Sequence, residues 1–193
     1  MSGRRGWVVV IPLKPARAGK SRLGTSEKVV RALGIATVRA AASTPGVRDV
    51  VVVTADATTV DDLTGMPRVR VVRELAPRGL RLAIASALAT VPAGVARAVL
   101  LGDLPGLVPA DLARVLAEAA RHPRTYVADA AGTGTTLVTA TAGVTWRSAF
   151  GRASASRHRA LGLHRIPVPL RSSLRHDVDT PAQLARSIAA ATI

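Results

Sequence analysis

Asp103, Asp177 and Asp179 are the acidic residues whose positions favour binding of a metal ion. Asp103 follows Gly102 directly after an apolar run, so a strand there would hold its carboxylate at the carboxyl edge of a sheet. Carboxylates in such a position bind hard cations such as Mg²⁺ together with phosphate oxygens. In an extended chain the side chains of Asp177 and Asp179 point to one face and suit a second metal contact. The alternative at both places is a carboxylate that caps a turn or the following helix.

A basic loop after the first apolar run suits phosphate binding. Its cations are Lys14, Arg17, Lys20 and Arg22. Gly19-Lys20-Ser21 imitates the end of a P-loop, but Lys14 stands where that motif requires glycine, which argues against a true P-loop. Cations between a strand end and the positive end of a helix form a cradle for a triphosphate. The alternative is a solvated basic loop.

Two segments rich in glycine and hydroxyl groups suit a second anionic group. One runs from Ala128 to Leu137 and contains Gly132-Thr133-Gly134-Thr135, and the other runs from Phe150 to His158. Glycines let backbone N–H groups converge on an anion without interference from a Cβ atom. We expect Arg157 and His158 to add positive charge there. The alternative is a pair of flexible surface loops.

The residue types exclude several other chemistries. The chain has no Cys, which excludes thiol nucleophiles and thiolate zinc sites. The four His residues lack zinc-ligand spacing, and no Ser lies in a nucleophile elbow. A mechanism based on charge neutralisation and positioning is therefore favoured over covalent catalysis.

The overall charge favours an anionic ligand of small size. The 193 residues include 27 Lys and Arg against 12 Asp and Glu, for a net charge of +15. Such a balance suits nucleic acid, but the Arg residues are spread along the chain and aromatic residues are only 2% of it, which disfavours a nucleic-acid interface. Positive potential also concentrates small anionic substrates.

The hydropathy pattern predicts one domain of the doubly wound α/β class, spanning residues 1–193. Short apolar runs typical of buried parallel strands alternate with helical patterns. The expected strands are Trp7–Ile11, Asp49–Thr54, Val69–Val72, Ala98–Leu101 and Thr125–Ala128, with two further strand-like pieces at Thr136–Ala140 and His164–Val168. The expected helices cover Val29–Ala41 and Leu112–Ala119, and a last one follows Thr180.

The first apolar run does not predict a membrane segment. It covers only Trp7–Ile11 before Pro12 and Lys14, too short for a secretory or membrane-spanning stretch. We expect a cytoplasmic protein that does not associate with membranes.

Taken in order, five segments resemble the CofC/FbiD family, the guanylyltransferases of deazaflavin coenzyme F(420) biosynthesis. The matching segments are Ile11-Pro12-Leu13-Lys14 with Lys20-Ser21-Arg22-Leu23, Gly102-Asp103-Leu104-Pro105, Gly132-Thr133-Gly134-Thr135, Phe150-Gly151-x-x-Ser154-x-x-x-His158 and Asp177-Val178-Asp179-Thr180-Pro181. The family is similar in fold to the MobA-like nucleotidyltransferases. The resemblance therefore implies a three-layer α/β/α Rossmann-like sandwich with a mostly parallel sheet.

The resemblance implies transfer of GMP from GTP to phosphoenolpyruvate or 2-phospho-L-lactate, with release of pyrophosphate. Within the family, phosphoenolpyruvate is the implied acceptor, because the Arg- and Ala-rich composition resembles that of the branch associated with it. By motif match, Asp103 and Asp179 are the implied Mg²⁺ ligands. The implied cations of the triphosphate loop, which serve nucleotide binding and catalysis, are Lys14, Lys20 and Arg22. The implied acceptor-binding residues, in a loop-rich region at about residues 130–170, are Thr135, Gly151, Ser154 and His158.

One position departs from the family pattern. Gly79-Leu80-Arg81 stands where the family usually has Gly-Leu-Asn before a helix. Gly79 is the matching nucleotide-binding candidate, whereas Arg81 replaces an Asn amide expected near the nucleotide. Two alternatives therefore stay open. One is a MobA-like nucleotidyltransferase with a different acceptor, and the other is a basic α/β module that binds nucleic acid.

Overall fold

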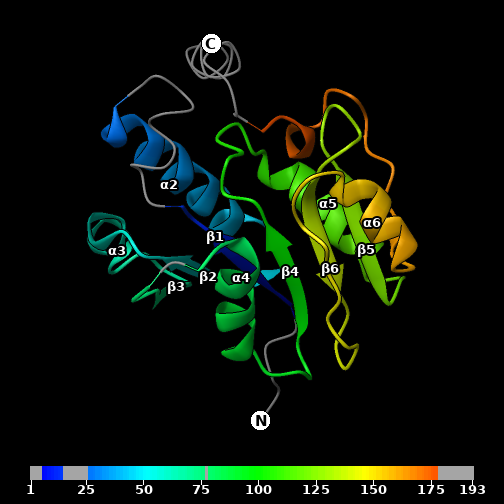
Figure 1. The fold of residues 1–193 in the computed structure, drawn as a ribbon, viewed down its shortest axis with the longest axis horizontal. Helices are drawn as coiled ribbons and strands as arrows, with labels where there is room; N and C mark the ends of the chain where they lie inside the picture. Colours follow the sequence, from blue (N-terminus) through cyan, green and yellow to red (C-terminus); the bar gives the residue numbers. More distant parts are fainter. Residues whose placement is uncertain (1–5, 15–25, 77, 178–193) are drawn as a thin grey trace.

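A computed structural model describes residues 6–14, 26–76 and 78–177, and within them seven strands form one sheet in the order β3-β2-β1-β4-β6-β5-β7 (Figure 1). The strands are β1 (Trp7–Pro12), β2 (Val47–Thr54), β3 (Val69–Arg73), β4 (Ala96–Leu100), β5 (Arg124–Ala128), β6 (Thr135–Ala140) and β7 (His164–Arg165). Every residue of β1 is buried, as expected for a central strand covered on both faces.

The sheet is mostly parallel, and β6 is the exception. β1 pairs in parallel with β2 and β4, whereas β6 runs antiparallel to both β4 and β5. The N–H of Leu101 donates to the carbonyl of Thr136 over 2.9 Å. The beginning of β6 therefore lies beside the end of β4, so Thr135 shares an edge of the sheet with the residues that follow β4.

Helices cover both faces of this sheet (Figure 1). They are α2 (Glu27–Ser43), α3 (Ala57–Leu63), α4 (Leu80–Ala89), α5 (Pro109–Ala119) and α6 (Ser154–Ala160), and a short 3₁₀ helix, η1, spans Ser173–Arg175. One core contains buried residues of α2, α3 and α5, and the other contains those of α4 and α6. Alternate residues of β1 belong to opposite cores, with Val9 in the first and Val10 in the second. The expected three-layer α/β/α sandwich is confirmed.

Local sequence explains where the long helix α2 begins. The Ser26 side chain accepts a hydrogen bond from the N–H of Val29 over 3.3 Å, which satisfies one of the unpaired N–H groups of the first turn. The buried residues Ile35, Val38 and Ala41 then form the stripe that packs on the sheet.

The strands agree with the sequence-based expectations more closely than the helices. The strands β1 to β6 begin and end within two residues of the expected bounds, but the piece expected at His164–Val168 forms a strand only over His164–Arg165. The short helices α3 and α6 were not expected, and α4 was implied only by the resemblance at Gly79-Leu80-Arg81. The helix expected after Thr180 lies outside the described residues.

Within the described ranges, no helix is both long enough and apolar enough to cross a membrane.

Candidate active site

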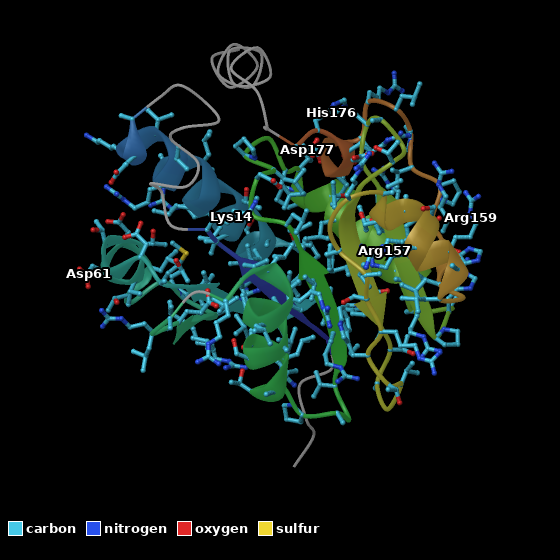
Figure 2. All side chains as sticks on the ribbon, in the orientation of Figure 1. Lys14, Asp61, Arg157, Arg159, His176 and Asp177 are labelled. Atoms are coloured by element: carbon cyan, nitrogen blue, oxygen red, sulfur yellow. The ribbon has the colours of Figure 1, made fainter. Side chains whose placement is uncertain are left out.

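Lys14 and Asp103 lie on neighbouring loops at the carboxyl edge of the sheet. Lys14 follows β1 and is exposed, and Asp103 follows β4 and is partly buried. Because β1 and β4 are adjacent parallel strands, both loops leave the sheet at the same edge. Figure 2 shows Lys14 near the end of β1 and Asp177 next to η1. The edge thus carries a cation and carboxylates, the combination needed for a metal-bound phosphate.

Leu13 packs between two glycines and fixes the spacing of these loops. A Cβ atom at Gly102 would overlap Cδ2 of Leu13 and lie 3.1 Å from the Pro12 carbonyl oxygen. On the other side, a Cβ atom at Gly34 would lie 3.0 Å from the same Cδ2. Glycine at both positions therefore allows the residue before Lys14 to pack directly against the residue before Asp103.

The turn between β5 and β6 is organised by Asp129. Its Oδ1 accepts a hydrogen bond from the N–H of Thr133 over 3.0 Å, and its Oδ2 accepts one from the N–H of Gly134 over 2.8 Å. A Cβ atom at Gly134 would overlap this Oδ2. Gly132 adopts φ +76°, which favours glycine. The alternative of a flexible surface loop does not hold for this segment, which is a tightly hydrogen-bonded turn that leads into Thr135.

Arg175 joins the segment before Asp177 to this turn. Its residue surface is only 7% exposed. The guanidinium donates to the carbonyl of Asp129 over 3.1 and 2.9 Å and to the carbonyl of Ala130 over 3.0 Å. Next to it, the hydroxyl of Thr136 donates to the carbonyl of Leu174 over 2.6 Å. The chain that leads to Asp177 is therefore held against the beginning of β6.

Asp111 anchors the other side of η1. Its Oδ2 accepts from the N–H of Ser173 over 2.9 Å and from the hydroxyls of Ser173 and Ser172 over 2.8 and 3.2 Å. Burial alone would raise the pKa of Asp111, but these hydrogen bonds and the nearby Arg114 hold it below its usual value. Asp111 is thus an ionised structural anchor at the start of α5.

His158 and Thr135 form a buried pair across α6 and β6. The ring Nδ1 of His158 lies 2.9 Å from Oγ1 of Thr135, and the N–H of Ala149 donates to Nε2 over 2.8 Å. Burial, with a further contribution from Arg157, lowers the pKa of His158 from 6.5 to about 4. The expectation that His158 adds positive charge is therefore wrong, because the ring is fully buried and neutral at pH 7.

The other acceptor candidates surround the start of α6. Gly151 adopts φ +119°, and Ser154, the first residue of α6, is 2% exposed. Nη1 of Arg157 lies 3.8 Å from the position that a Cβ atom would take at Gly151. The N–H of Ala155 donates to the carbonyl of Thr133 over 3.0 Å. The structure thus brings Thr135, Gly151 and Ser154 into one region and places the cation of Arg157 beside it.

Gly79 lies at the N-terminus of α4, after the edge strand β3. It has φ +93° and is exposed, and a Cβ atom there would meet no other atom within 4 Å among the described residues. The positive φ explains glycine at this position. Arg81, in the first turn of α4, is also exposed. A nucleotide-binding role for Gly79 stays a prediction.

Four candidate residues, Arg17, Lys20, Arg22 and Asp179, lie outside the described residues. The expected pairing of Asp103 with Asp179 is therefore a prediction. Over residues 6–14, 26–76 and 78–177, no three His, Cys, Asp or Glu side chains gather into a metal site. Mg²⁺ needs only one or two carboxylates besides phosphate and water oxygens, so the Asp103 carboxylate, at the same sheet edge as Lys14, suits this ion.

Three residues of the site were not identified as functional from the sequence. They are Asp129, Asp111 and Arg175. The Asp129-x-x-Gly132-Thr133-Gly134 spacing, with a carboxylate ahead of glycines, was the available signal for the turn. No local pattern marks Arg175 or Asp111, because their partners lie 45 to 62 residues away in sequence.

Comparisons with known proteins agree with this arrangement. Residues 20–170 match the MobA-like NTP transferase domain. The chain is 42% identical over 192 residues to the phosphoenolpyruvate guanylyltransferase of Streptomyces coelicolor, covering 95% of this chain and 90% of that protein. It is 41% identical over 189 residues to the protein of the same name from Salinispora arenicola, covering 94% and 87%.

A solved structure shows the same fold at low identity. The 4-diphosphocytidyl-2C-methyl-D-erythritol synthase of Anaerococcus prevotii superposes with a TM-score of 0.67 at 9% identity, covering 98% of this chain and 99% of that one. The sheet edge described above is thus part of a nucleotidyltransferase fold. The chain belongs to the MobA-like NTP transferase family and, within it, to the phosphoenolpyruvate guanylyltransferases.

Proposed function

We propose that this protein transfers GMP from GTP to phosphoenolpyruvate and releases pyrophosphate, as a single transferase domain serving coenzyme F(420) biosynthesis. The observation that carries the proposal is the identity of 42% to a phosphoenolpyruvate guanylyltransferase over 95% of the chain. Both substrates are cytoplasmic metabolites, so the proposed reaction takes place in the cytoplasm.

The proposed reaction exchanges one phosphoanhydride bond for another. An oxygen of the acceptor phosphate attacks the α-phosphorus of GTP, and the bond between the α-phosphorus and its bridging oxygen to the β-phosphate breaks. Pyrophosphate leaves with that bridging oxygen. The phosphate monoester is already an anionic nucleophile, so the chain needs no general base. What the chain must supply is positioning and cancellation of the repulsion between two polyanions.

The basic loop supplies the charge on the nucleotide side. Lys14 lies at the end of β1, and we assign Lys20 and Arg22 of the same loop to the triphosphate as well. Cations at this place stabilise the negative charge that develops on the leaving pyrophosphate. Gly79 is the proposed contact on the nucleoside side.

Mg²⁺ is the proposed cofactor, and Asp103 and Asp179 are the residues that would hold it. When bound, the ion stabilises the attacking and leaving oxygens and neutralises phosphate charge. Asp103 is supported by its place after β4, beside the loop of Lys14. The packing of Leu13 against Gly102 keeps these two loops in register.

The acceptor side is assigned to the region around the start of α6. Thr135, Gly151 and Ser154 are the proposed contacts for the three-carbon acid, and the Arg157 guanidinium close to Gly151 favours an anion there. The region lies at the sheet edge that also carries Asp103, because β6 begins where β4 ends. The acceptor phosphate can therefore face the nucleotide across this edge.

Arg81 supports a second candidate with altered substrate choice. An exposed guanidinium in the first turn of α4 replaces the amide that the resembling family has there. The candidate is a nucleotidyltransferase of the same fold that accepts another base or another phosphorylated acid, such as 2-phospho-L-lactate.

A substrate matrix tests these assignments. The purified protein is incubated with each of ATP, GTP, CTP and UTP against phosphoenolpyruvate, 2-phospho-L-lactate and 3-phosphoglycerate, with and without Mg²⁺, and pyrophosphate is measured. We expect release only with GTP, phosphoenolpyruvate and Mg²⁺ together. Release with another pair would favour the second candidate. Salt-dependent retention on DNA without any pyrophosphate release would favour a nucleic-acid-binding module.

A further inference from the structure

The hydrogen bonds around His158 determine which ring nitrogen carries the proton. A backbone N–H can only donate, so the N–H of Ala149 requires a lone pair on Nε2, 2.8 Å away. A neutral imidazole has one N–H and one lone pair. The proton is therefore on Nδ1, which faces Oγ1 of Thr135 at 2.9 Å.

This tautomer determines the direction of the bond to Thr135. The Nδ1–H of His158 donates, so Oγ1 of Thr135 accepts. The hydroxyl proton of Thr135 is then left to point elsewhere, and no acceptor for it is found among the described residues. A buried hydroxyl proton without an acceptor is unfavourable unless a ligand supplies one.

The surroundings keep the ring in this state. His158 is fully buried between α6 and β6, with the rings of Tyr126 and Phe150 at centroid distances of 5.7 and 5.3 Å. Burial and the neighbouring Arg157 lower its pKa to about 4, so it is neutral at pH 7. A protonated ring would place Nε2–H against the N–H of Ala149.

We propose that His158 is a positioning residue that makes the Thr135 hydroxyl an obligatory hydrogen-bond donor toward an oxyanion of the acceptor substrate. The proposal rests on the proposed function, in which Thr135 contacts the acceptor. The oxyanion belongs to either the carboxylate or the phosphate of the acid, since both offer unprotonated oxygens. The Arg157 guanidinium near Gly151 adds the charge complementarity that such an oxygen requires.

The tautomer can be read directly in the intact protein. With ¹⁵N-labelled histidine, long-range ¹H–¹⁵N correlation spectra at pH 7 distinguish protonated from unprotonated ring nitrogens, and the spectrum of His158→Gln assigns the signals. We expect a neutral ring with the proton on Nδ1. A proton on Nε2, or on both nitrogens, would overturn the proposal. This readout needs no substrate, so it stands apart from the proposed function.

Kinetics of matched variants test the donor role. Thr135→Val removes the hydroxyl at nearly constant shape, and Thr135→Ser retains it. We expect Thr135→Val to raise the KM for the acceptor ~10- to 100-fold, the loss of a hydrogen bond to a charged group, with the KM for GTP within about twofold of wild type. Thr135→Ser should stay close to wild type. An unchanged acceptor KM in Thr135→Val would contradict the proposal.

Two substitutions at His158 separate its two hydrogen bonds. The Asn amide can replace the Nδ1–H donor, whereas the Gln carbonyl can replace the Nε2 acceptor. His158→Asn should therefore keep acceptor affinity better than His158→Gln. In a Thr135→Val background, His158→Gln should raise the acceptor KM no further, because His158 acts through that hydroxyl. If the two substitutions raised the acceptor KM additively, His158 would have a structural role that is separate from the Thr135 hydroxyl. Should these buried changes prevent folding, the Thr135 variants still decide.

Two competitors identify the oxyanion. Inorganic phosphate carries only the phosphate group, and pyruvate carries only the carboxylate. Both are tested as competitive inhibitors against the acceptor. Weakened inhibition by one of them in Thr135→Val assigns the hydroxyl to that group. If neither inhibition constant changes while both compounds compete, Thr135 donates to neither group and the proposal fails. Wild-type protein without any transferase activity would instead refute the proposed function and leave the spectroscopic result intact.

Discussion

The guanidinium of Arg175 donates two hydrogen bonds to the carbonyl oxygen of Asp129, over 3.1 and 2.9 Å. This contact connects two parts of the site that are 46 residues apart in sequence. Asp129 shapes the turn before Thr135, and Arg175 precedes Asp177 by two residues. The turn of the acceptor region and the segment that leads to the second acidic motif are thereby held together.

Removal of this guanidinium should destabilise the protein. Arg175→Ala removes a buried guanidinium and leaves the partly buried carbonyl of Asp129 and the carbonyl of Ala130 without these donors, so we expect the free energy of unfolding to fall by about 1–3 kcal/mol. Urea denaturation measures this difference. Arg171→Ala, which removes an exposed guanidinium from the same segment, is the control and should change stability by about 0.5 kcal/mol or less. Equal effects of the two substitutions would contradict the anchoring role of Arg175.

A methyl group at Gly102 should disturb both loops of the nucleotide side. In Gly102→Ala the new Cβ overlaps Cδ2 of Leu13, an atom that would also lie only 3.0 Å from a Cβ atom at Gly34. Overpacking of this kind lowers stability by about 1–3 kcal/mol, and turnover should fall because Lys14 and Asp103 shift. Thermal unfolding and pyrophosphate assays measure the two effects.

Two further variants test whether the overlap with Leu13 causes the losses in Gly102→Ala. Gly94→Ala, at a position where a Cβ atom meets nothing within 4 Å among the described residues, should leave stability and turnover near wild type. The double variant Gly102→Ala, Leu13→Ala should recover part of the lost stability, since the overlapping side chain is removed. A Gly102→Ala protein as stable as Gly94→Ala would show that the two loops are not tightly packed.

Neutralisation of Asp103 should abolish catalysis and preserve the fold. In Asp103→Asn the shape is retained but the carboxylate charge is lost, and we expect pyrophosphate release to fall at least ~100-fold, the scale of a lost metal or electrostatic contact. Asp61→Asn changes an exposed carboxylate on α3, which Figure 2 shows apart from Lys14, and should retain activity. Circular dichroism verifies both folds. Normal turnover in Asp103→Asn would remove this residue from the proposed metal site.

The buried His158 should make stability decrease in weak acid. Its pKa is lowered from 6.5 to about 4 in the folded protein, so the unfolded chain binds a proton that the folded chain does not bind between these values. The ring does not lower the free energy of unfolding above pH 6.5. As the pH falls from 6.5 to about 4, protonation of His158 in the unfolded chain lowers the free energy of unfolding by up to about 3 kcal/mol. Denaturant unfolding of wild type and His158→Gln over this range measures it. Parallel profiles of the two proteins would exclude a buried neutral ring.

Much of the fold followed from local sequence patterns. Strands such as β1 were predictable because continuous apolar runs indicate burial on both faces. The direction of β6 was not predictable in this way, since alternation or apolarity does not distinguish parallel from antiparallel pairing. Helix α6 was missed because its sequence is rich in Ser, Arg and His, and its buried face includes His158 in place of a larger apolar residue.

The site was predictable at strand ends and less so at long range. Asp103 and Lys14 were identified because each follows a buried strand, and the carboxyl ends of parallel strands meet at one edge. The charge of His158 was misjudged because its state depends on Thr135 and Ala149, which reach it only through the tertiary fold. The same reason applies to Arg175, whose partners are the backbone carbonyls of a distant turn.

Isotope transfer from a labelled acceptor tests the central claim most directly. Phosphoenolpyruvate carrying ¹⁸O in its phosphate is incubated with GTP, Mg²⁺ and the protein, and the products are analysed by mass spectrometry. We predict that all label stays in a product that joins GMP to the acid through a new phosphoanhydride, and that the pyrophosphate contains none. Label in the pyrophosphate, or pyrophosphate formed at the same rate without the acid, would contradict attack by the acceptor phosphate on GTP.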